Sequence, residues 1–276
     1  MTLFKLVTAN LEHGRRNCDS GTLKGILLKE SQPDIIFIQE STPERLSLGD
    51  SYQLLDFPDE NTPSDSGERM DIYYRQNSSW IVTHQTLINS YPQASPRPSL
   101  LVTLEHPSTT SSITLANVHL CGGRYDENDQ LGGLLQGDLT RIQQLKTELL
   151  RDLVEKHHVD IIAGDFNSDL NCYLNQGQLC PQQLSYFERV SPGKNLQVYQ
   201  QWNLAPYNYL YSQGYQSAYT RSSNGHLMST SIFGNHPDAI WFKPEKIQSG
   251  KQGMIDFLTP NLSDHQGLSW TCQVAH

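Results

Sequence analysis

Gly164-Asp165-Phe166-Asn167-Ser168-Asp169 directly follows an apolar run from Val159 to Ala163. A short apolar run that stops at a glycine is typical of a buried β-strand. Asp165 can ionise, accept a proton or bind a hard cation, and Asn167 donates hydrogen bonds without adding charge. Because Gly, Asp, Asn and Ser are also common turn residues, this stretch by itself predicts a simple turn and a functional strand end about equally.

The composition suits one globular unit. The chain has 276 residues, is 37% hydrophobic and carries a net charge of -9. This length provides one sizeable core, so we expect a single domain over residues 1–276. The negative charge argues against nucleic-acid binding through bulk positive charge, but a divalent metal can supply positive charge locally. The negative charge therefore does not exclude a nuclease.

Cysteine usage and hydropathy favour a cytoplasmic protein, which we also expect to be a monomer. The five cysteines form no C-x-x-C pair, and we expect mostly reduced thiols, with a Cys172–Cys180 disulfide as the less favoured alternative. No apolar run approaches the roughly 20 residues of a transmembrane span. Met1 leads almost directly into a strand pattern, so no signal peptide is visible. A mature secreted protein that begins with an added Met would look the same.

Two segments repeat one strand–helix–strand pattern. In the first, a strand from Leu3 to Asn10 and a helix from Thr22 to Lys29 precede an apolar strand over residues 34–40. In the second, a strand from Ile113 to Leu120 and a helical pattern over residues 139–154 precede the strand that ends at Asp165. Each segment contains Ala-Asn near the end of its first strand and Asp-Ile-Ile at the start of its second. We interpret this as an internal pseudo-repeat that brings polar strand ends to one shared edge.

The remaining segments are less regular. Residues 70–75, 80–88 and 100–105 are typical of antiparallel strands. A region from Leu170 to His236, rich in Gln, Asn, Tyr and Gly, is predicted to be irregular or to contain short elements. Strands are predicted again over residues 238–242, 254–258 and 268–274.

Polar residues gather at the predicted strand ends and loop tips. They are Asn10, Glu40, His119, Asp165, Asn167, Asp238, Asp264 and His265. Carboxylates and an amide can bind Mg²⁺ or Mn²⁺, and histidines among them can contact phosphate or act as acid and base. The set fits metal-assisted attack of water on phosphorus. Taken singly, Glu40 suits a solvated strand end, His119 a satisfied core histidine and Asp264 a turn cap.

Six blocks, in order from residue 8 to 265, resemble the endonuclease/exonuclease/phosphatase superfamily with its deoxyribonuclease I-like fold. They are Thr8-Ala9-Asn10-Leu11, Ile38-Gln39-Glu40, Asn117-Val118-His119-Leu120, Gly164-Asp165-Phe166-Asn167, Pro237-Asp238-Ala239-Ile240 and Ser263-Asp264-His265. The resemblance implies an α/β fold, a four-layer sandwich of two mixed central β-sheets flanked by helices.

The resemblance also implies roles for these residues. Glu40 is the expected principal metal ligand, with Asn10 and Asp264 near it. Asp165 is expected to orient or deprotonate the attacking water, and Asn167 and His119 to donate hydrogen bonds to the phosphoryl oxygens. His265, hydrogen-bonded to Asp238, is expected to contact the phosphate or assist the leaving group.

Further residues are weaker candidates. Residues 67–75 resemble the segment that supplies a carboxylate partner to the first histidine in deoxyribonuclease I-type enzymes, so we expect a Glu68–His119 pair; a surface Glu68 is equally compatible. Arg97, Arg124 and Arg141 are candidates for phosphate contacts, although a solvated cation is the favoured interpretation of each. Five tyrosines could stack on substrate, but we favour a core role: Tyr207, Tyr209, Tyr211, Tyr215 and Tyr219.

The sequence thus predicts a Mg²⁺-dependent phosphodiesterase, with a nuclease first among the possibilities. A hydrolase of lipid or inositol phosphates is the alternative, because the acidic chain shows no basic groove. A binding module without catalysis ranks last, since suitable residues stand at all the matched positions. The expected partner is a phosphodiester: nucleic acid, or a phosphorylated small molecule or lipid.

Overall fold

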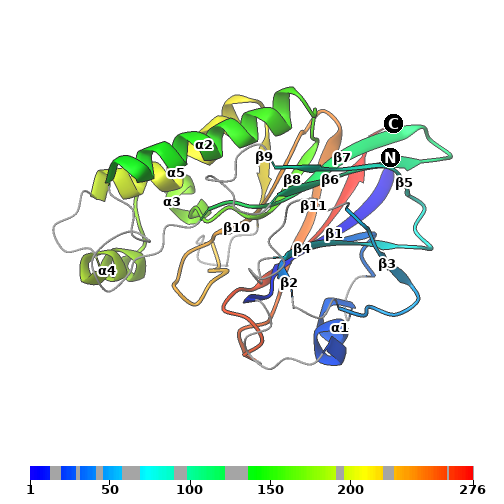
Figure 1. The fold of residues 1–276 in the computed structure, drawn as a ribbon, viewed down its shortest axis with the longest axis horizontal. Coiled ribbons are helices and arrows are strands. Elements are labelled where there is room, and N and C mark those ends of the chain that lie inside the picture. The colour runs from blue at the N-terminus through cyan, green and yellow to red at the C-terminus, as the bar shows by residue number, and fades with distance from the viewer. Residues whose placement is uncertain are drawn as a thin grey trace.

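Two six-stranded mixed β-sheets lie face to face with helices on their outer sides (Figure 1). The computed structural model describes residues 1–12, 20–28, 32–41, 46–57, 69–89, 98–121, 136–190, 196–219, 227–259 and 261–275. This architecture confirms the expected four-layer α/β sandwich. No helix in these ranges is both long and apolar enough to cross a membrane.

The two sheets have related strand orders. Sheet 1 runs β11 (Ile247–Ile255), β12 (Gly267–Val274), β1 (Thr2–Asn10), β2 (Ile35–Ser41), β4 (Arg69–Arg75) and β3 (Tyr52–Leu54). Sheet 2 runs β5 (Ile81–Ile88), β6 (Ser99–His106), β7 (Ser111–His119), β8 (Ile161–Asp165), β10 (Asp238–Phe242) and β9 (Gln216–Ala218). Among these strands, the central pairs β1–β2 and β7–β8 are parallel and the other pairs are antiparallel.

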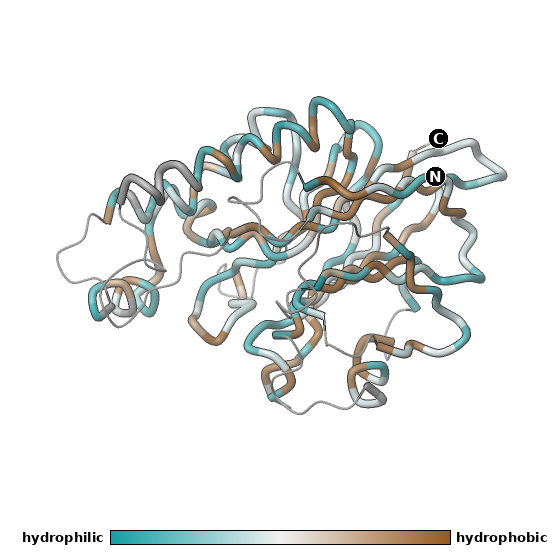
Figure 2. Tube along the Cα trace, in the orientation of Figure 1, coloured by the Kyte–Doolittle hydropathy of each residue, from teal (hydrophilic) through white to brown (hydrophobic). Residues whose placement is uncertain are grey.

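Helices cover the outer face of each sheet and create two further cores. The side of sheet 1 that faces away from sheet 2 packs on α1 (Ser20–Leu28), with Val7, Ile36 and Leu23 in the contact. The corresponding side of sheet 2 packs on α2 (Gln136–Glu155), α3 (Leu170–Leu174) and α5 (Leu196–Ser212). A fifth helix, α4 (Pro181–Val190), precedes α5. Figure 2 shows hydrophobic residues running along the strands of both sheets.

The two strand–helix–strand units match in detail. Asp34 precedes β2 and accepts a hydrogen bond from the Lys5 amide, 2.9 Å away. Asp160 precedes β8 and accepts the equivalent bond from the Thr114 amide, also at 2.9 Å. Each carboxylate also pairs with a cation, Arg75 or Lys246 respectively. The same anchoring of the second strand to the first supports the interpretation as a pseudo-repeat.

Strand periodicity decides which side chains enter the space between the sheets. Alternate residues of a strand point to opposite faces. In β8, Ile161 and Ala163 belong to the core between the sheets, whereas Ile162 packs toward the helices. The next residue on the inner face is Asp165. The polar strand end therefore continues the inner row of the central core.

A pair of buried amides joins the sheets beneath these strand ends. Gln39 of β2 donates from Nε2 to Oδ1 of Asn117 in β7, at 2.6 Å. Asn117 donates from Nδ2 to the carbonyl oxygens of Ile38 and Asp71, each at 3.1 Å. All these atoms are buried, so both amides exchange water for directional bonds across the inter-sheet space.

Several elements differ from their predicted form. The region from Leu170 to His236 contains α3, α4, α5 and β9. Strand β11 begins at Ile247, seven residues before the predicted start at Met254, and contains a register shift between Gln248 and Lys251. Cys172 and Cys180 are both free, so the less favoured disulfide is absent. Tyr207 and Tyr215 are core residues, as predicted, whereas Tyr211 is 67% exposed.

Gly164 has no room for a side chain. It has a φ of +141°, and a Cβ there would lie 2.0 Å from the carbonyl oxygen of Val118 in β7. We expect Gly164→Ala to lower the free energy of unfolding by about 3 kcal/mol or more, measured by urea denaturation. The control is Gly25→Ala in α1, where no atom lies within 4 Å of the added Cβ. That change should stabilise the protein by about 0.5–1 kcal/mol, and equal stability of both variants would contradict the close β7–β8 approach.

Candidate active site

Three polar side chains form a row across one end of sheet 2. In the strand register, Asp165 at the end of β8 pairs with His119 at the end of β7 and with Asp238 at the start of β10. All three residues are buried. His119 Nε2 lies 3.4 Å from Asp165 Oδ2. The strand register alone thus places one histidine and two carboxylates at the rim of the central core.

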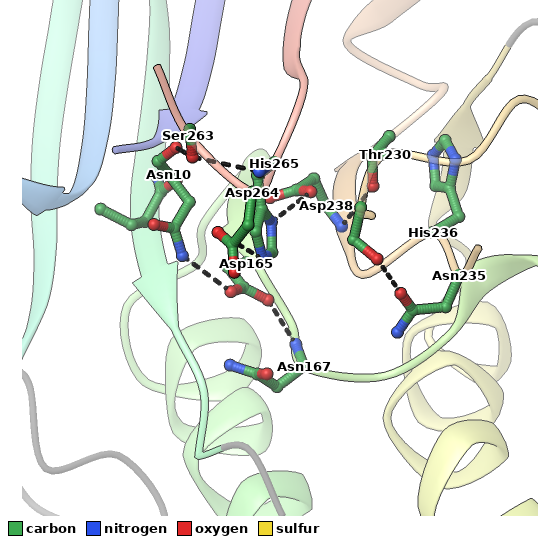
Figure 3. Close-up of polar contacts among 12 residues, drawn as sticks. Asn10, Asp165, Asn167, Thr230, Asn235, His236, Asp238, Ser263, Asp264 and His265 are labelled. Atoms are coloured by element: carbon green, nitrogen blue, oxygen red, sulfur yellow. Dashed lines mark hydrogen bonds and ion pairs between the residues drawn. The ribbon is translucent and has the colours of Figure 1, made fainter. Parts of the chain in front are cut away.

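Sheet 1 contributes Asn10 and Glu40 to the same place. Asn10 donates from Nδ2 to Asp165 Oδ2 at 3.1 Å (Figure 3). The same Nδ2 donates to Glu40 Oε1 at 3.2 Å. Glu40 Oε1 also lies 3.6 Å from His119 Nε2. The pseudo-repeat therefore brings the two predicted strand ends, one from each sheet, into direct contact.

Glu40 reaches this position through a local irregularity of β2. Strict alternation would direct it, like Ile36 and Ile38, toward α1. Instead, Glu40 has a φ of +49°, and the β2–β4 register shifts between Ile38 and Ser41. Such a bulge re-aims a side chain at a strand end. The Glu40 carboxylate consequently meets Asn10 at the inter-sheet edge.

His265 enters from the loop before β12. Its Nδ1 lies 2.9 Å from Asp238 Oδ2, which confirms the expected contact between these two residues (Figure 3). The loop is anchored by Ser263, which donates from Oγ to the Asn10 carbonyl oxygen at 2.8 Å and accepts from the His265 amide at 3.1 Å. His265 Nε2 is 3.9 Å from Asp264 Oδ1. The contacts fix the loop to the end of β1.

Asn167 lies in the turn after β8 with a φ of +46°. Its backbone amide donates to Asp165 Oδ1 at 2.7 Å, and its side-chain Nδ2 donates to the Leu120 carbonyl oxygen at 2.9 Å. Asparagine tolerates this left-handed conformation better than most residues. The turn therefore holds both the Asp165 carboxylate and the Asn167 amide at the strand end.

The pKa values of the two central groups, Asp165 and His265, are both raised, but for different physical reasons. Burial raises the pKa of Asp165 to about 6; the charge of His265 opposes this, whereas Asp238 and Glu40 add to it. Burial alone would lower the pKa of His265, but the charge and hydrogen bond of Asp238 outweigh it and raise that pKa to about 10. At neutral pH the site therefore combines an Asp165 carboxylate near its pKa with an imidazolium.

The donor set fits a hard divalent cation. Asp165, Asp238 and His265 offer ligand atoms within 4.8 Å of one another, the single such group among the described residues. Asp238 Oδ1 is buried and has no hydrogen-bond partner among the described residues. The side chains of Glu40 and Asp264 are 17% and 19% exposed, so ions can reach them from solvent. Crowded carboxylate oxygens of this kind are ligands that Mg²⁺ and Mn²⁺ accept.

Some expected residues lie outside the described part of the chain. These are Glu68, Arg97 and Arg124; Arg141 lies in α2, but the structure does not describe its side chain. The Glu68–His119 pair and the arginine contacts with phosphate stay predictions. Asn10, Glu40, His119, Asp165, Asn167, Asp238, Asp264 and His265 all lie in the described part and adjoin one another as stated above.

Two residues near this site, Ser263 and Lys146, had no predicted role. Ser263, which anchors the His265 loop, directly precedes Asp264-His265 and was visible within that block. Lys146 is fully buried behind the Asn167 turn. Its spacing from Leu149, Leu150 and Leu153 places it on the apolar stripe of α2, and a lysine on such a stripe is the signal that could have found it.

Comparisons with known proteins agree with this architecture. The model of the Endonuclease/Exonuclease/phosphatase family matches residues 7–265. The human Nocturnin catalytic domain with bound sulfate anion is 17% identical, with a TM-score of 0.58 and coverage of 99% of this chain and 94% of that chain. An endonuclease/exonuclease/phosphatase from Bacteroides vulgatus is 11% identical, with a TM-score of 0.64 and complete coverage of both chains. D. rerio TDP2 complexed with single strand DNA product is 16% identical, with a TM-score of 0.56 and coverage of 99% and 100%. A search of curated proteins found no match.

Proposed function

The chain belongs to the endonuclease/exonuclease/phosphatase family, whose members are metal-dependent phosphoric ester hydrolases, and from this premise we propose that it is a Mg²⁺-dependent phosphodiesterase acting on nucleic acid. The observation that carries the proposal is the contact of Asn10 with both Glu40 and Asp165. It joins the proposed metal side of the site, in sheet 1, to the proposed water-activating side, in sheet 2.

Asp165 is the proposed general base. Its carboxylate is oriented by two donors, the Asn167 amide and Asn10 Nδ2, at 2.7 and 3.1 Å. A pKa of about 6 leaves it mostly ionised at pH 7 yet basic enough to accept a proton from water. The two hydrogen bonds keep the carboxylate from rotating, so the proton-accepting lone pairs face one direction.

His265 is the proposed cation at the phosphate. Asp238 holds Nδ1, which leaves Nε2 to donate toward a phosphoryl or leaving oxygen. His119 and the Asn167 side chain are the proposed donors to the other oxygens as negative charge grows on them. Asn167 Nδ2 donates one of its two hydrogens to the Leu120 carbonyl oxygen, which leaves the second for a phosphoryl oxygen.

Glu40, Asn10 and Asp264 are the proposed ligands of the metal, which when bound supplies charge stabilisation to the reacting phosphate. Asn10 Oδ1 accepts one hydrogen bond, from the Glu12 amide at 3.0 Å, and its second lone pair is available to a cation. Asp238 Oδ1, the buried acceptor without a described partner, lies in the adjoining group with Asp165 and His265.

Nucleic acid is the proposed substrate class. Among proteins of similar fold, one was solved with a single-stranded DNA product and another with a sulfate anion, which has the tetrahedral shape of phosphate. A net charge of -9 disfavours long, purely electrostatic contacts with duplex DNA. We therefore place single-stranded nucleic acid ahead of duplex.

A substrate panel tests the proposal. Purified protein with Mg²⁺ is offered single-stranded DNA, plasmid DNA, RNA, sphingomyelin and inositol phosphates. We expect cleavage of nucleic-acid phosphodiesters, with single strands cleaved fastest. Turnover restricted to sphingomyelin or inositol phosphates would transfer the assignment to the alternative hydrolase class. No turnover on any of them would contradict an enzyme and favour a binding module.

The Asp238–His265 pair gives a separate prediction. Asp238→Asn removes the negative charge that keeps His265 protonated, so we expect the pKa of His265 to fall substantially from about 10 in protein kept metal-free with EDTA. Because the folded-state pKa is raised, the pair stabilises the fold at acidic and neutral pH, and this contribution is lost as the pH rises through about 10. The measurement is imidazole NMR titration of both proteins. An unchanged His265 titration in Asp238→Asn would remove Asp238 from this role.

A further inference from the structure

A buried cation lies directly behind the turn that carries Asn167. Lys146, in the middle of α2, has no exposed surface. Its Nζ lies 3.0 Å from Ser168 Oγ and 3.3 Å from the Asn167 carbonyl oxygen. The ammonium group also lies 4.3 Å from the centroid of the Trp202 ring, on α5. Lys146 thus connects two helices to the turn after β8.

Trp202 holds the same carbonyl. Its indole Nε1 donates to the Asn167 oxygen at 3.0 Å. The Asn167 carbonyl therefore accepts from two side chains, one on each covering helix, while the Asn167 amide donates to Asp165 Oδ1 at 2.7 Å. Both backbone polar groups of residue 167 are fixed, one toward the helices and one toward the site. A residue with a φ of +46° needs such restraint, because this conformation is otherwise disfavoured.

Packing alone does not account for Lys146. Its hydrogen-bond partners among the described residues are a carbonyl and a hydroxyl, both uncharged. Burial lowers the pKa of its amine to about 7, against opposing contributions from Cys121 and Asp165. An apolar side chain of the same length would fill the space without this desolvation cost. Such a side chain could not supply the hydrogen bonds that Lys146 makes to the turn.

We propose that Lys146 and Trp202 are positioning residues of the active site. Their two donors hold the Asn167 carbonyl, which keeps the Asn167 amide on Asp165 and its side chain at the phosphate position. Neither residue touches substrate. The catalytic part of this inference rests on the proposed function, whereas the restraint on the turn does not.

Two variants test it. Lys146→Met keeps length and volume but removes the donor, and Trp202→Phe keeps a ring beside Lys146 but removes the indole N–H. We expect each to lower kcat at least about 10-fold with KM unchanged, because a misplaced catalytic group slows chemistry without weakening binding. The double variant should lose less than the product of the single losses, since both donors hold one carbonyl. Lys156→Met is the control: this lysine is 66% exposed and pairs with Asp152.

A second readout is independent of activity. Hydrogen exchange followed by ¹⁵N NMR should show a faster-exchanging Asn167 amide in both variants and an unchanged one in Lys156→Met. Folded Lys146→Met with wild-type kcat and wild-type Asn167 exchange would overturn the inference. If Lys146→Met does not fold, Trp202→Phe decides by the same two criteria. If the wild-type protein has no turnover, the proposed function fails, while the exchange data still test the restraint.

Discussion

Asp165→Asn should reduce turnover by at least about 10³-fold while leaving the fold intact. The amide cannot accept a proton from water, yet it matches the carboxylate in shape. Asp165 bonds to Asn10 and to the Asn167 amide, and one of these two bonds survives the change. The measurement is kcat on the best substrate of the panel under saturating Mg²⁺.

Thermal unfolding of the same variant separates chemistry from stability. Because burial raises the pKa of Asp165 to about 6, its contribution to stability is greatest at acidic pH and is lost as the pH rises through about 6. At pH 7.5 the neutral amide avoids this cost, which offsets the lost hydrogen bond. We expect the Tm to lie within about 4 °C of wild type. Retained turnover would exclude Asp165 as the general base. A Tm far below that of wild type would show that Asp165 acts mainly in stabilising the fold.

Metal removal should abolish activity altogether. After EDTA treatment we expect no detectable cleavage, and addition of Mg²⁺ or Mn²⁺ should restore it. The physical reason is the crowding of the carboxylates of Glu40, Asp165 and Asp238, which leaves the site without enough positive charge for a phosphodiester. Activity that survives chelation would contradict the proposed mechanism.

A measurement of metal binding tests whether Glu40 is a ligand of the metal. At 100 times its Kd, a metal that binds only the folded state stabilises the protein by about 2.7 kcal/mol. We therefore expect Mg²⁺ to raise the Tm of the wild-type protein and to raise that of Glu40→Gln much less. The matched control is Glu105→Gln, an exposed carboxylate in β6. Equal stabilisation of wild type and Glu40→Gln would place the metal elsewhere, with the Asp165–Asp238–His265 group as the next candidate.

Local patterns predicted the central strands and most of the site. The apolar runs that end at Asn10, His119 and Asp165 form strands whose alternation carries these residues to the inner face. The position of Glu40 did not follow from alternation, because a bulge and a positive φ redirect it. Glu40 was a candidate because it ends an apolar strand, whereas its expected role as principal metal ligand came from the family resemblance.

Other elements could not be predicted because their local signals conflict. Helix α5 contains Pro206, which normally ends a helix, among polar and aromatic residues. Strand β11 contains two glycines and a register shift, both of which weaken a strand pattern. The bond between Ser263 and Asn10 joins residues 253 positions apart, and such contacts emerge only from the assembled fold.

The amides of Gln39 and Asn117 limit how far one sheet can slide along the other. Apolar contact is non-directional, so a small shear between two hydrophobic faces changes its free energy little. The 2.6 Å Gln39–Asn117 bond and the two carbonyl contacts of Asn117 depend on direction and would break. The Asn10–Asp165 contact spans the same boundary. The distance between the two halves of the site is thus set by Gln39 and Asn117, which lie beneath the site and take no part in the chemistry.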